Sequence, residues 1–504
     1  MTETATPMAP ARVPQFPWLI AAAAFFLAIK VIYMFRVGPI MDEAYYWMWG
    51  QHPGLSYFDH PPLQAWLLGI SDALFGRSLV GIRWMTFATL AGTFYIFYLW
   101  ARRMVGDNWR TLFWPGVVIY LASPSFGYFT SLAFHDYLLL FLLLCSGHFF
   151  LKVLLDTEED RPARTGDLYL GAIFLGLATL TKYNGMFLGL GLGAYILFKP
   201  SLRRKLMGNP HLWLAGLLSI AMQAPVLYWN WSTGFASFNF HLNTRHADGW
   251  LEQFNWRSFT EFPVVSALLV SPFLVPVFWR FFTRDHATTF ENVAKGLAVW
   301  TFWLSTTVFI YVSLYDWVYW WWNFTAYILV MPFAARYMGQ RWLFWLNVAA
   351  GAVFAIYMIV SNAFLPLSLI HGPSDWRQTR LFGWEEIERE VSAARERLHP
   401  DFIASDGPDM AAVVGFALDD RDVTAITDRK TQFYYWWDPE AHRGQNALVV
   451  LYEYDRPAFS QSQFETFTLV SEHEVERFGY RITGFRIYYG ENYQPRAVDG
   501  LHGL

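Results

Sequence analysis

The stretch MDEAYYWMWGQHPGLSYFDHPPL, residues 41–63, places two ionisable pairs, Asp42-Glu43 and Asp59-His60, among aromatic residues and prolines. It follows the first long apolar run of the chain, so these charges are expected where a membrane meets water. Helix capping is one interpretation, because Asp42 could cap the helix that follows and Asp59 could cap one starting at Pro61-Pro62. Four ionisable groups in one short loop exceed what capping needs, and charged groups at membrane depth are candidates for function.

Three further polar sites follow apolar runs on the same predicted face of the membrane. They are His135-Asp136 in SLAFHDYLLL, Lys182-Tyr183-Asn184 in LTKYNG, and the group His241, Arg245 and His246 in NFHLNTRHADGW. Each has a simpler alternative: a helix cap at Asp136, a lysine that reaches the interface at Lys182, and a solvated loop face at His241. The sequence leaves these alternatives open.

Carboxylates and scattered cations on one face suit a reaction in which a hydroxyl group attacks and a phosphate leaves. A carboxylate can take the proton of the hydroxyl, and Lys, Arg or His can stabilise the charge that grows on the phosphate. The chain has no Walker or Rossmann glycine pattern, no HExxH and no CxxC pair, so neither nucleotide hydrolysis nor a structural zinc site is indicated. A lipid-linked, phosphate-activated donor is the natural alternative, and the sequence predicts no cofactor and requires no divalent metal.

The composition indicates a membrane protein with many spans. The 504 residues are 55% hydrophobic and only 15% charged, well below the roughly 25% charged residues of an average soluble domain. The net charge is −4 without a basic tail, so nucleic acid is not an expected partner. The single cysteine, Cys145, lies in an apolar run and excludes a disulfide framework.

About eleven apolar runs of roughly 17–25 residues have the length that spans a bilayer as a helix. The predicted spans are 18–37, 79–101, 111–129, 136–155, 168–182, 185–199, 211–229, 263–282, 294–314, 323–339 and 342–363. A tight turn is expected at Lys182-Asn184, because one helix through both neighbouring runs would be too long. Two short amphipathic helices at the interface are expected in the first outer loop, in DEAYYWMWG and FDHPPLQAWLLGI.

Basic residues orient these spans by the positive-inside rule. The connections at 102–110, 152–167, 199–210, 280–295 and 336–341 are all basic, whereas those at 123–135 and 315–322 have no Lys or Arg. We therefore expect residues 1–17 to be a disordered cytoplasmic terminus and residues 18–37 to be a retained signal anchor. The odd number of spans places the C-terminal part outside the cytoplasm.

The character of the chain changes near residue 364. Segments of helical and strand pattern alternate from there on, at 384–398, 401–405, 409–418, 423–427, 447–452 and 482–489. The sequence thus predicts a polytopic α-helical membrane domain over 18–363 and a soluble α/β domain over 364–504, facing the periplasm.

The acidic pair in DEAYYWMWG, followed about sixteen residues later by YFDHPPL, resembles the first-loop signature of GT-C glycosyltransferases. The similarity is greatest to bacterial relatives of protein O-mannosyltransferases and of the transferases that add aminoarabinose or galacturonic acid to lipid A and lipopolysaccharide core. It extends over AFHDYLLLF, LATLTKYNG, WNWSTGFASFNFHLNTRH and YWWWNFTAYILVMPFAA, and so covers most of residues 15–365.

The resemblance implies an inverting transfer of a sugar from a polyprenyl-phosphate donor, on the periplasmic side of a bacterial inner membrane. The acceptor would be lipid A, lipopolysaccharide core or another envelope glycan; a protein O-glycosyltransferase, a lipid-linked-sugar flippase and a membrane scaffold remain alternatives. Asp42 matches the catalytic base, and Glu43 and Asp136 are further catalytic candidates. Candidates for binding the donor phosphate or substrate are Tyr57, Asp59, His60, His135, Lys182, Tyr183, Arg245, His246 and Asn323.

His60 departs from the family pattern, because the pair before the prolines is commonly Glu-Lys in the lipid A transferases. A histidine there would make the charge of a phosphate ligand dependent on pH. The identity of the sugar and of its acceptor is not encoded in any of these motifs.

Overall fold

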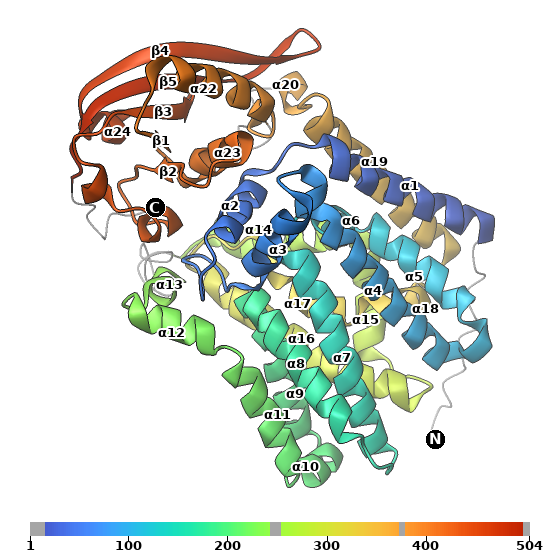
Figure 1. The fold of residues 1–504 in the computed structure, drawn as a ribbon. Coiled ribbons are helices and arrows are strands. Elements are labelled where there is room, and N and C mark those ends of the chain that lie inside the picture. The colour runs from blue at the N-terminus through green and yellow to red at the C-terminus, as the bar shows by residue number, and fades with distance from the viewer. Residues whose placement is uncertain (1–15, 242–253, 372–378, 497–504) are drawn as a thin grey trace. The chain divides into compact units, whose positions relative to one another are not determined.

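The computed structural model describes residues 16–241, 254–371 and 379–496. The chain divides into two compact units, which are drawn as ribbons in Figure 1. The first unit contains 16–31, 85–231 and 254–356 among the described residues. The second contains 32–84, 232–241, 357–371 and 379–496.

The first unit is built from helices. Its long members are α1 (Phe16–Arg36), α4 (Leu79–Val105), α7 (His135–Glu158), α16 (Thr289–Ser313) and α19 (Arg341–Ala363), of which α1, α4 and α19 extend past the boundaries of the unit. Its shorter helices are α5 (Arg110–Ala122), α6 (Pro124–Phe129), α8 (Thr165–Thr181), α9 (Met186–Phe198), α10 (Pro200–Leu206), α11 (Pro210–Ala221), α12 (Ala224–Ser232), α14 (Trp256–Val270), α15 (Val275–Thr283), α17 (Phe324–Ile328) and α18 (Ala334–Tyr337). Short 3₁₀ turns include η2 (Tyr183–Gly185), η4 (Pro272–Leu274) and η5 (Trp320–Asn323).

Every predicted span coincides with helical structure, but the helices differ in length. Five described helices are long and apolar enough to cross a membrane, and three bent pairs of helices would raise that number to eight. The predicted range 323–339 is a chain of short helices, and 263–282 is bent by 86° where Pro272 interrupts it. The predicted turn at Lys182 is confirmed, because α8 ends at Thr181 and α9 begins at Met186. The total of eleven spans stays a prediction.

Small residues let the helices of the first unit approach one another. A Cβ atom at Gly191 of α9 would clash with Thr301 of α16, and one at Gly296 of α16 would clash with Tyr195 of α9. A Cβ atom at Gly171 of α8 would likewise clash with the ring of Phe150 on α7. Close backbone approach at small residues is how apolar helices gain packing energy where no hydrophobic force acts between them.

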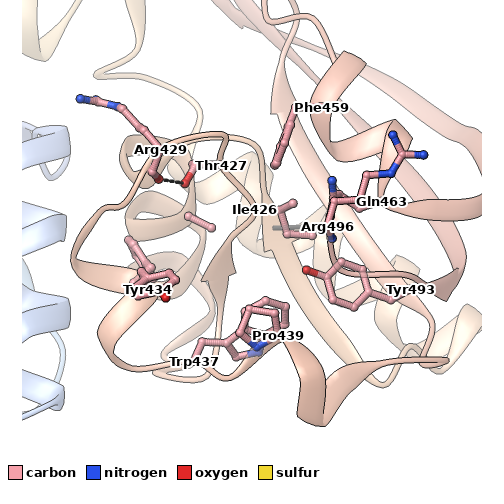
Figure 2. A pocket seen from close by; sticks show the side chains of 12 residues that line it. Ile426, Thr427, Arg429, Tyr434, Trp437, Pro439, Phe459, Gln463, Tyr493 and Arg496 are labelled. Atoms are coloured by element: carbon pink, nitrogen blue, oxygen red, sulfur yellow. Dashed lines mark hydrogen bonds between the residues drawn. The ribbon is translucent and has the colours of Figure 1, made fainter. Parts of the chain in front are cut away.

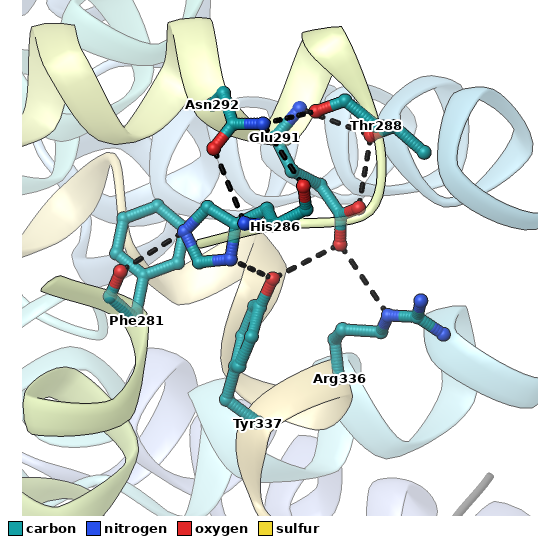
Figure 3. A network of polar contacts seen from close by, with 7 residues as sticks. All are labelled: Phe281, His286, Thr288, Glu291, Asn292, Arg336 and Tyr337. Atoms are coloured by element: carbon teal, nitrogen blue, oxygen red, sulfur yellow. Dashed lines mark hydrogen bonds and ion pairs between the residues drawn. The ribbon is translucent and has the colours of Figure 1, made fainter. Parts of the chain in front are cut away.

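A buried polar network joins the connection between α15 and α16 to α18 (Figure 3). The Tyr337 hydroxyl lies 2.6 Å from His286 Nδ1 and 3.1 Å from Glu291 Oε1. Glu291 also accepts from the Thr288 hydroxyl at 2.9 Å and pairs with Arg336 Nε at 3.3 Å. These contacts satisfy a carboxylate that is 1% exposed, and they fix one of the predicted basic connections in place.

The second unit contains a five-stranded sheet with the order β2-β1-β3-β5-β4. The strands are β1 (Phe402–Ser405), β2 (Thr424–Ala425), β3 (Ala447–Tyr452), β4 (Phe464–Arg477) and β5 (Tyr480–Tyr493). β1 pairs in parallel with β2 and β3, whereas β5 pairs antiparallel with β3 and β4. The helices of this unit are α2 (Met41–Gln51), α3 (Leu63–Phe75), α13 (Ala236–Asn239), α20 (Ser368–His371), α22 (Trp384–Leu398), α23 (Pro408–Leu418) and α24 (Ala458–Ser462), with 3₁₀ turns η7 (Gln432–Tyr435) and η8 (Pro439–His442).

The predicted helix at 384–398 has the same bounds as α22, and the two helices expected in the first outer loop are α2 and α3. Strand β4 was not predicted, because much of its surface is solvated and its pattern is largely polar. The second unit also holds the first outer loop, which the predicted boundary at 364 did not anticipate.

Helix α2 packs closely against α3 and α23. Gly50 on α2 and Gly69 on α3 approach so closely that a Cβ at Gly50 would lie 2.7 Å from the Gly69 nitrogen. Trp47 of α2 meets the ring of Phe416 on α23 edge-on at 5.2 Å. Arg77, just after α3, donates to the carbonyl oxygens of Phe416 and Ala417 at 2.9 Å each. These contacts fix α2, which carries the first acidic motif, to the sheet-containing part of the chain.

Candidate active site

Glu43 and Arg83 form an ion pair in which both side chains are fully buried. Arg83 Nε donates to Glu43 Oε1 at 2.8 Å, and its Nη2 pairs with the other carboxylate oxygen. The guanidinium also donates to three carbonyl groups at the end of α1, those of Tyr33 (2.6 Å), Val37 (2.7 Å) and Gly38 (3.0 Å). Because Glu43 Oε2 accepts from the Ile40 N–H at 3.1 Å as well, this pair fixes the start of α2 to the end of α1.

Asp42 is exposed on the first turn of α2. The helix begins at Met41 with Ile40 at the N-cap position, so the capping interpretation of Asp42 is wrong. Its neighbour Glu43 satisfies the N-cap backbone instead. The two acidic residues therefore differ in their surroundings. Glu43 fixes the first turn of α2 through its contacts with Arg83 and Ile40, whereas Asp42 on the same turn is exposed to solvent.

Asp59 and His60 lie in the bend between α2 and α3, and both are half-buried. The Tyr45 hydroxyl donates to Asp59 Oδ2 at 2.9 Å. His241 Nε2 lies 2.8 Å from the Asp59 carbonyl oxygen, and the His241 and His60 rings are 6.4 Å apart. Since α3 begins at Leu63 with Pro62 at its N-cap, Asp59 is not a helix cap either. The bend thus gathers an acid and two imidazoles from distant parts of the sequence.

Tyr45 remains a hydrogen-bond donor at any physiological pH. Burial and the neighbouring Asp59 carboxylate raise the pKa of its hydroxyl well above the ordinary value. The proton therefore stays on the phenol oxygen, and the contact with Asp59 is a charge-assisted hydrogen bond to the carboxylate.

Tyr57, predicted to contact substrate, is packed inside the loop. Its ring stacks on Trp49 with centroids 4.7 Å apart and is fully buried. Its hydroxyl donates to the Trp49 carbonyl at 2.9 Å and accepts from the Gly54 N–H at 3.1 Å. Backbone groups of the same loop occupy this hydroxyl, which indicates a structural role.

In the first unit, Lys182 and Asp136 meet as a buried ion pair. Lys182 Nζ lies 2.9 Å from Asp136 Oδ1, and the two side chains are 8% and 5% exposed. Asp136 lies in the first turn of α7, whose N-cap is Phe134, so it is not the cap of that helix. His135 precedes it and is also buried. The structure thus joins two residues that the sequence presented as separate candidates.

The two remaining described candidates lie near the end of α8 and at the start of α17. Tyr183 is half-buried in the turn after Lys182. Asn323 is fully buried; its Oδ1 accepts from Ser305 at 2.6 Å, and its Nδ2 donates to Thr306 at 2.9 Å. Both contacts are to α16, so Asn323 joins α16 to α17. Arg245 and His246 lie outside the described residues.

Arg83 and Gln432 are two site-supporting residues that the motifs did not reveal. The position of Arg83 inside the apolar run 79–101 could have indicated a structural role, because a charge in such a run needs a buried partner. Gln432 lies 374 residues from its hydrogen-bond partner Phe58, and no local pattern distinguishes it. No cluster of three or more metal-binding side chains occurs among the residues whose structure is described.

Comparisons with known proteins agree with this fold. Residues 59–229 match the family model of dolichyl-phosphate-mannose-protein mannosyltransferases. The chain is 24% identical over 388 residues to the lipid A galacturonosyltransferase RgtD of Rhizobium johnstonii, covering 75% of this chain and 78% of that protein.

The fold is similar to that of ArnT from Cupriavidus metallidurans. The ArnT crystal structure with bound undecaprenyl phosphate matches with a TM-score of 0.60 at 16% identity, and the apo structure with 0.61 at 14%. Each match covers 94% of this chain and 98% of the ArnT chain. These matches show that the chain shares the fold of ArnT, and that residues 59–229 resemble the mannosyltransferase family model.

Proposed function

We propose that this protein transfers a sugar from a polyprenyl-phosphate-linked donor to lipid A, lipopolysaccharide core or another envelope glycan. The observation that carries the proposal is the first turn of α2. Asp42 is exposed there, while the adjacent Glu43 is locked by Arg83. A carboxylate held on a rigid turn in a GT-C fold is suited to general-base catalysis.

The reaction is a single displacement with inversion. An acceptor hydroxyl oxygen attacks the anomeric carbon, the bond from that carbon to the phosphate oxygen breaks, and polyprenyl phosphate leaves. Asp42 takes the proton of the hydroxyl. Lys182 and His60 are proposed to balance the charge on the departing phosphate, as are Arg245 and His246.

The other candidates are assigned by their surroundings. Glu43, Tyr57 and Asn323 are proposed to position the site rather than to touch substrate, because backbone or side-chain partners occupy their polar atoms. Asp136 is proposed to hold Lys182 until the donor phosphate competes for that ammonium group. Asp59 would orient the His60 segment through Tyr45.

Two relatives support the choice of donor and acceptor. ArnT was crystallised with undecaprenyl phosphate, the lipid that such a reaction releases, and RgtD is a lipid A galacturonosyltransferase. The mannosyltransferase family model keeps a protein acceptor as the second candidate. We place the reaction on the periplasmic side of a bacterial inner membrane, with residues 364–504 on that side, because the predicted inner connections are basic.

The direct test is to supply purified protein in nanodiscs with a panel of radiolabelled polyprenyl-phosphate sugars and with lipid A or an unfolded protein as acceptor. Release of polyprenyl phosphate together with labelled lipid A supports the proposal. Label on the protein acceptor would favour protein O-glycosylation instead. Movement of intact donor across the bilayer without release of polyprenyl phosphate would indicate a transporter.

A further inference from the structure

Residues 431–436, with the sequence TQFYYW, lie against the first outer loop within the second unit; we call them the 431–436 strap. The strap contains the turn η7 and follows β2. Phe433 stacks on Tyr45 with centroids 5.9 Å apart and an angle of 20°, and Trp436 stacks on His52 at 4.4 Å. The strap therefore packs against the middle of α2 and against its C-cap, close to the bend that carries Asp59.

Gln432 makes two polar contacts with the first outer loop. Its side-chain Oε1 accepts from the Phe58 N–H at 2.6 Å, and its own backbone N–H donates to the Tyr45 hydroxyl oxygen at 3.3 Å. The residue is 2% exposed. Burial of an amide side chain is favourable only when such bonds are made, so these contacts are specific ones.

The Tyr45 hydroxyl takes part in two hydrogen bonds, and it can donate in only one of them because it carries a single proton. Tyr45 has one hydroxyl proton, which it donates to Asp59 Oδ2 at 2.9 Å. Its oxygen then accepts from Gln432 N–H. The chain of donors runs from Gln432 through Tyr45 to the Asp59 carboxylate, and each bond polarises the next.

The side of the strap near β2 borders a hollow. Figure 2 shows this pocket, lined by Tyr434, Trp437, Pro439 and Tyr493 among others, and Phe433 also lines it. Thr427 closes the turn before the strap by donating to the Arg429 carbonyl at 2.7 Å. Because the hollow leaves part of this side open, the strap is held mainly from its other side, by the hydrogen bonds of Gln432 and by the stacked rings of Phe433 and Trp436.

We propose that Gln432 is a positioning residue for transfer: it sets the orientation of Asp59 and the adjacent His60 through Tyr45 and Phe58. The inference rests on the proposed function, in which this segment meets the donor phosphate. It also gives the sheet-containing part of the chain a task, since that part supplies the support for a motif in the first loop.

Kinetics of the full-length protein in nanodiscs test the role of Gln432. Gln432→Met keeps the side-chain length but removes the acceptor for Phe58, and it should raise the donor KM roughly tenfold with a smaller change in kcat. Gln463→Met is the matched control, because Gln463 is 1% exposed and also accepts a backbone N–H, from Arg496 at 2.8 Å. This control should keep the donor KM within about twofold of wild type.

Tyr45→Phe removes the hydroxyl between Gln432 and Asp59 and should reproduce the effect on donor KM. The double variant Tyr45→Phe/Gln432→Met should lose less than the product of the two single effects, because the two changes remove different hydrogen bonds, at Phe58 and at Asp59, that hold the same bend. Fully multiplicative effects would overturn the inference, as would equal KM values for Gln432→Met and Gln463→Met.

Hydrogen exchange followed by mass spectrometry gives an arm that needs no enzymatic activity. Amides in residues 54–60 should exchange faster in Gln432→Met than in wild type and should be unchanged in Gln463→Met. Unchanged exchange in Gln432→Met would refute the positioning role even if transfer is observed. Faster exchange without any transfer by wild type would preserve the structural coupling and refute the proposed function alone.

Discussion

The Glu43–Arg83 pair of the second unit and the Asp136–Lys182 pair of the first are both buried, yet their charges are satisfied to different degrees. Arg83 reaches both carboxylate oxygens of Glu43 and three backbone carbonyl groups. Among the described residues, the Lys182 ammonium group donates one side-chain hydrogen bond, to Asp136. An ammonium group has three donors, so Lys182 retains capacity that Arg83 has used.

We interpret this difference as one between a structural ion pair, Glu43–Arg83, and a proposed donor-binding pair, Asp136–Lys182. A guanidinium whose donors are all occupied gains nothing from a ligand, and removing its partner leaves a buried charge. A lysine paired with one carboxylate can exchange that partner for a phosphate, because it presents a point charge on a flexible stem. The number of bonds that each charge makes thus indicates its task better than its burial does.

The largest effect is expected from Arg83→Met. The substitution leaves Glu43 buried without its cation, which typically costs about 3–5 kcal/mol. Thermal unfolding in nanodiscs should show a large drop in midpoint temperature. The double variant Glu43→Leu/Arg83→Met should recover much of the loss, because no unpaired charge remains. If Arg83→Met were as stable as wild type, the Glu43–Arg83 pair would not have the structural role assigned to it.

Lys182 should affect donor binding more than folding. In an Asp136→Asn background, which removes the buried carboxylate, Lys182→Met should weaken donor affinity by roughly 1.5–3 kcal/mol, the size of a charge-assisted hydrogen bond. Binding of a polyprenyl-phosphate sugar can be measured by calorimetry.

Lys152→Met in an Asp167→Asn background is the matched control for Lys182, because these residues form another Lys–Asp pair of the first unit, at 2.6 Å. It should leave donor affinity unchanged. Equal losses in both double variants would mean that Lys182 has no special relation to the donor.

The smallest effect concerns Asp406, at the end of β1, where a carboxylate is poorly compensated. Burial and the neighbouring Asp455 raise the pKa of Asp406 to about 7. Between the ordinary aspartate pKa of 3.8 and about pH 7, the folded state therefore binds more protons at Asp406 than the unfolded state does. Asp406 thus makes the free energy of unfolding fall as the pH rises through that range. Asp406→Asn should flatten the fall and stabilise the protein at pH 8 by roughly 1–2 kcal/mol.

Thermal unfolding from pH 5 to 8 measures this effect, with Asp438→Asn, an exposed acidic residue of the same unit, as the control. A wild-type profile and an Asp406→Asn profile that run parallel would contradict the assignment.

The sequence predicted the helices well, because their signals are local. Apolar runs marked the long helices, and a helix-like segment rich in Glu and Arg marked α22 with its observed bounds. Strand β4 was missed because most of its residues are solvated and lack an apolar alternation. The extent of the second unit was missed for a different reason: α2 joins it through contacts with α23, such as Trp47 with Phe416, which no local pattern reveals.

The site was predictable to the level of motifs, not of roles. Asp42 and Glu43 are adjacent acidic residues, and only their surroundings distinguish an exposed carboxylate from one with a guanidinium partner forty residues away. Lys182 and Asp136 were proposed as separate candidates, because a contact between residues 46 positions apart depends on the tertiary structure and leaves no local sequence pattern. No sequence pattern marks Gln432 as important, because its role depends on hydrogen bonds with Tyr45 and Phe58 that form only in the folded chain.

The most direct measurement is single-turnover transfer by Asp42→Asn beside wild type, with donor affinity and unfolding temperature determined for the same samples. Asp42 is exposed on a turn that Glu43 and Arg83 hold, so the variant should fold and bind donor as wild type does. Removal of a general base should slow transfer about 10²- to 10⁴-fold. Transfer at the wild-type rate by a folded, donor-binding Asp42→Asn protein would contradict the account.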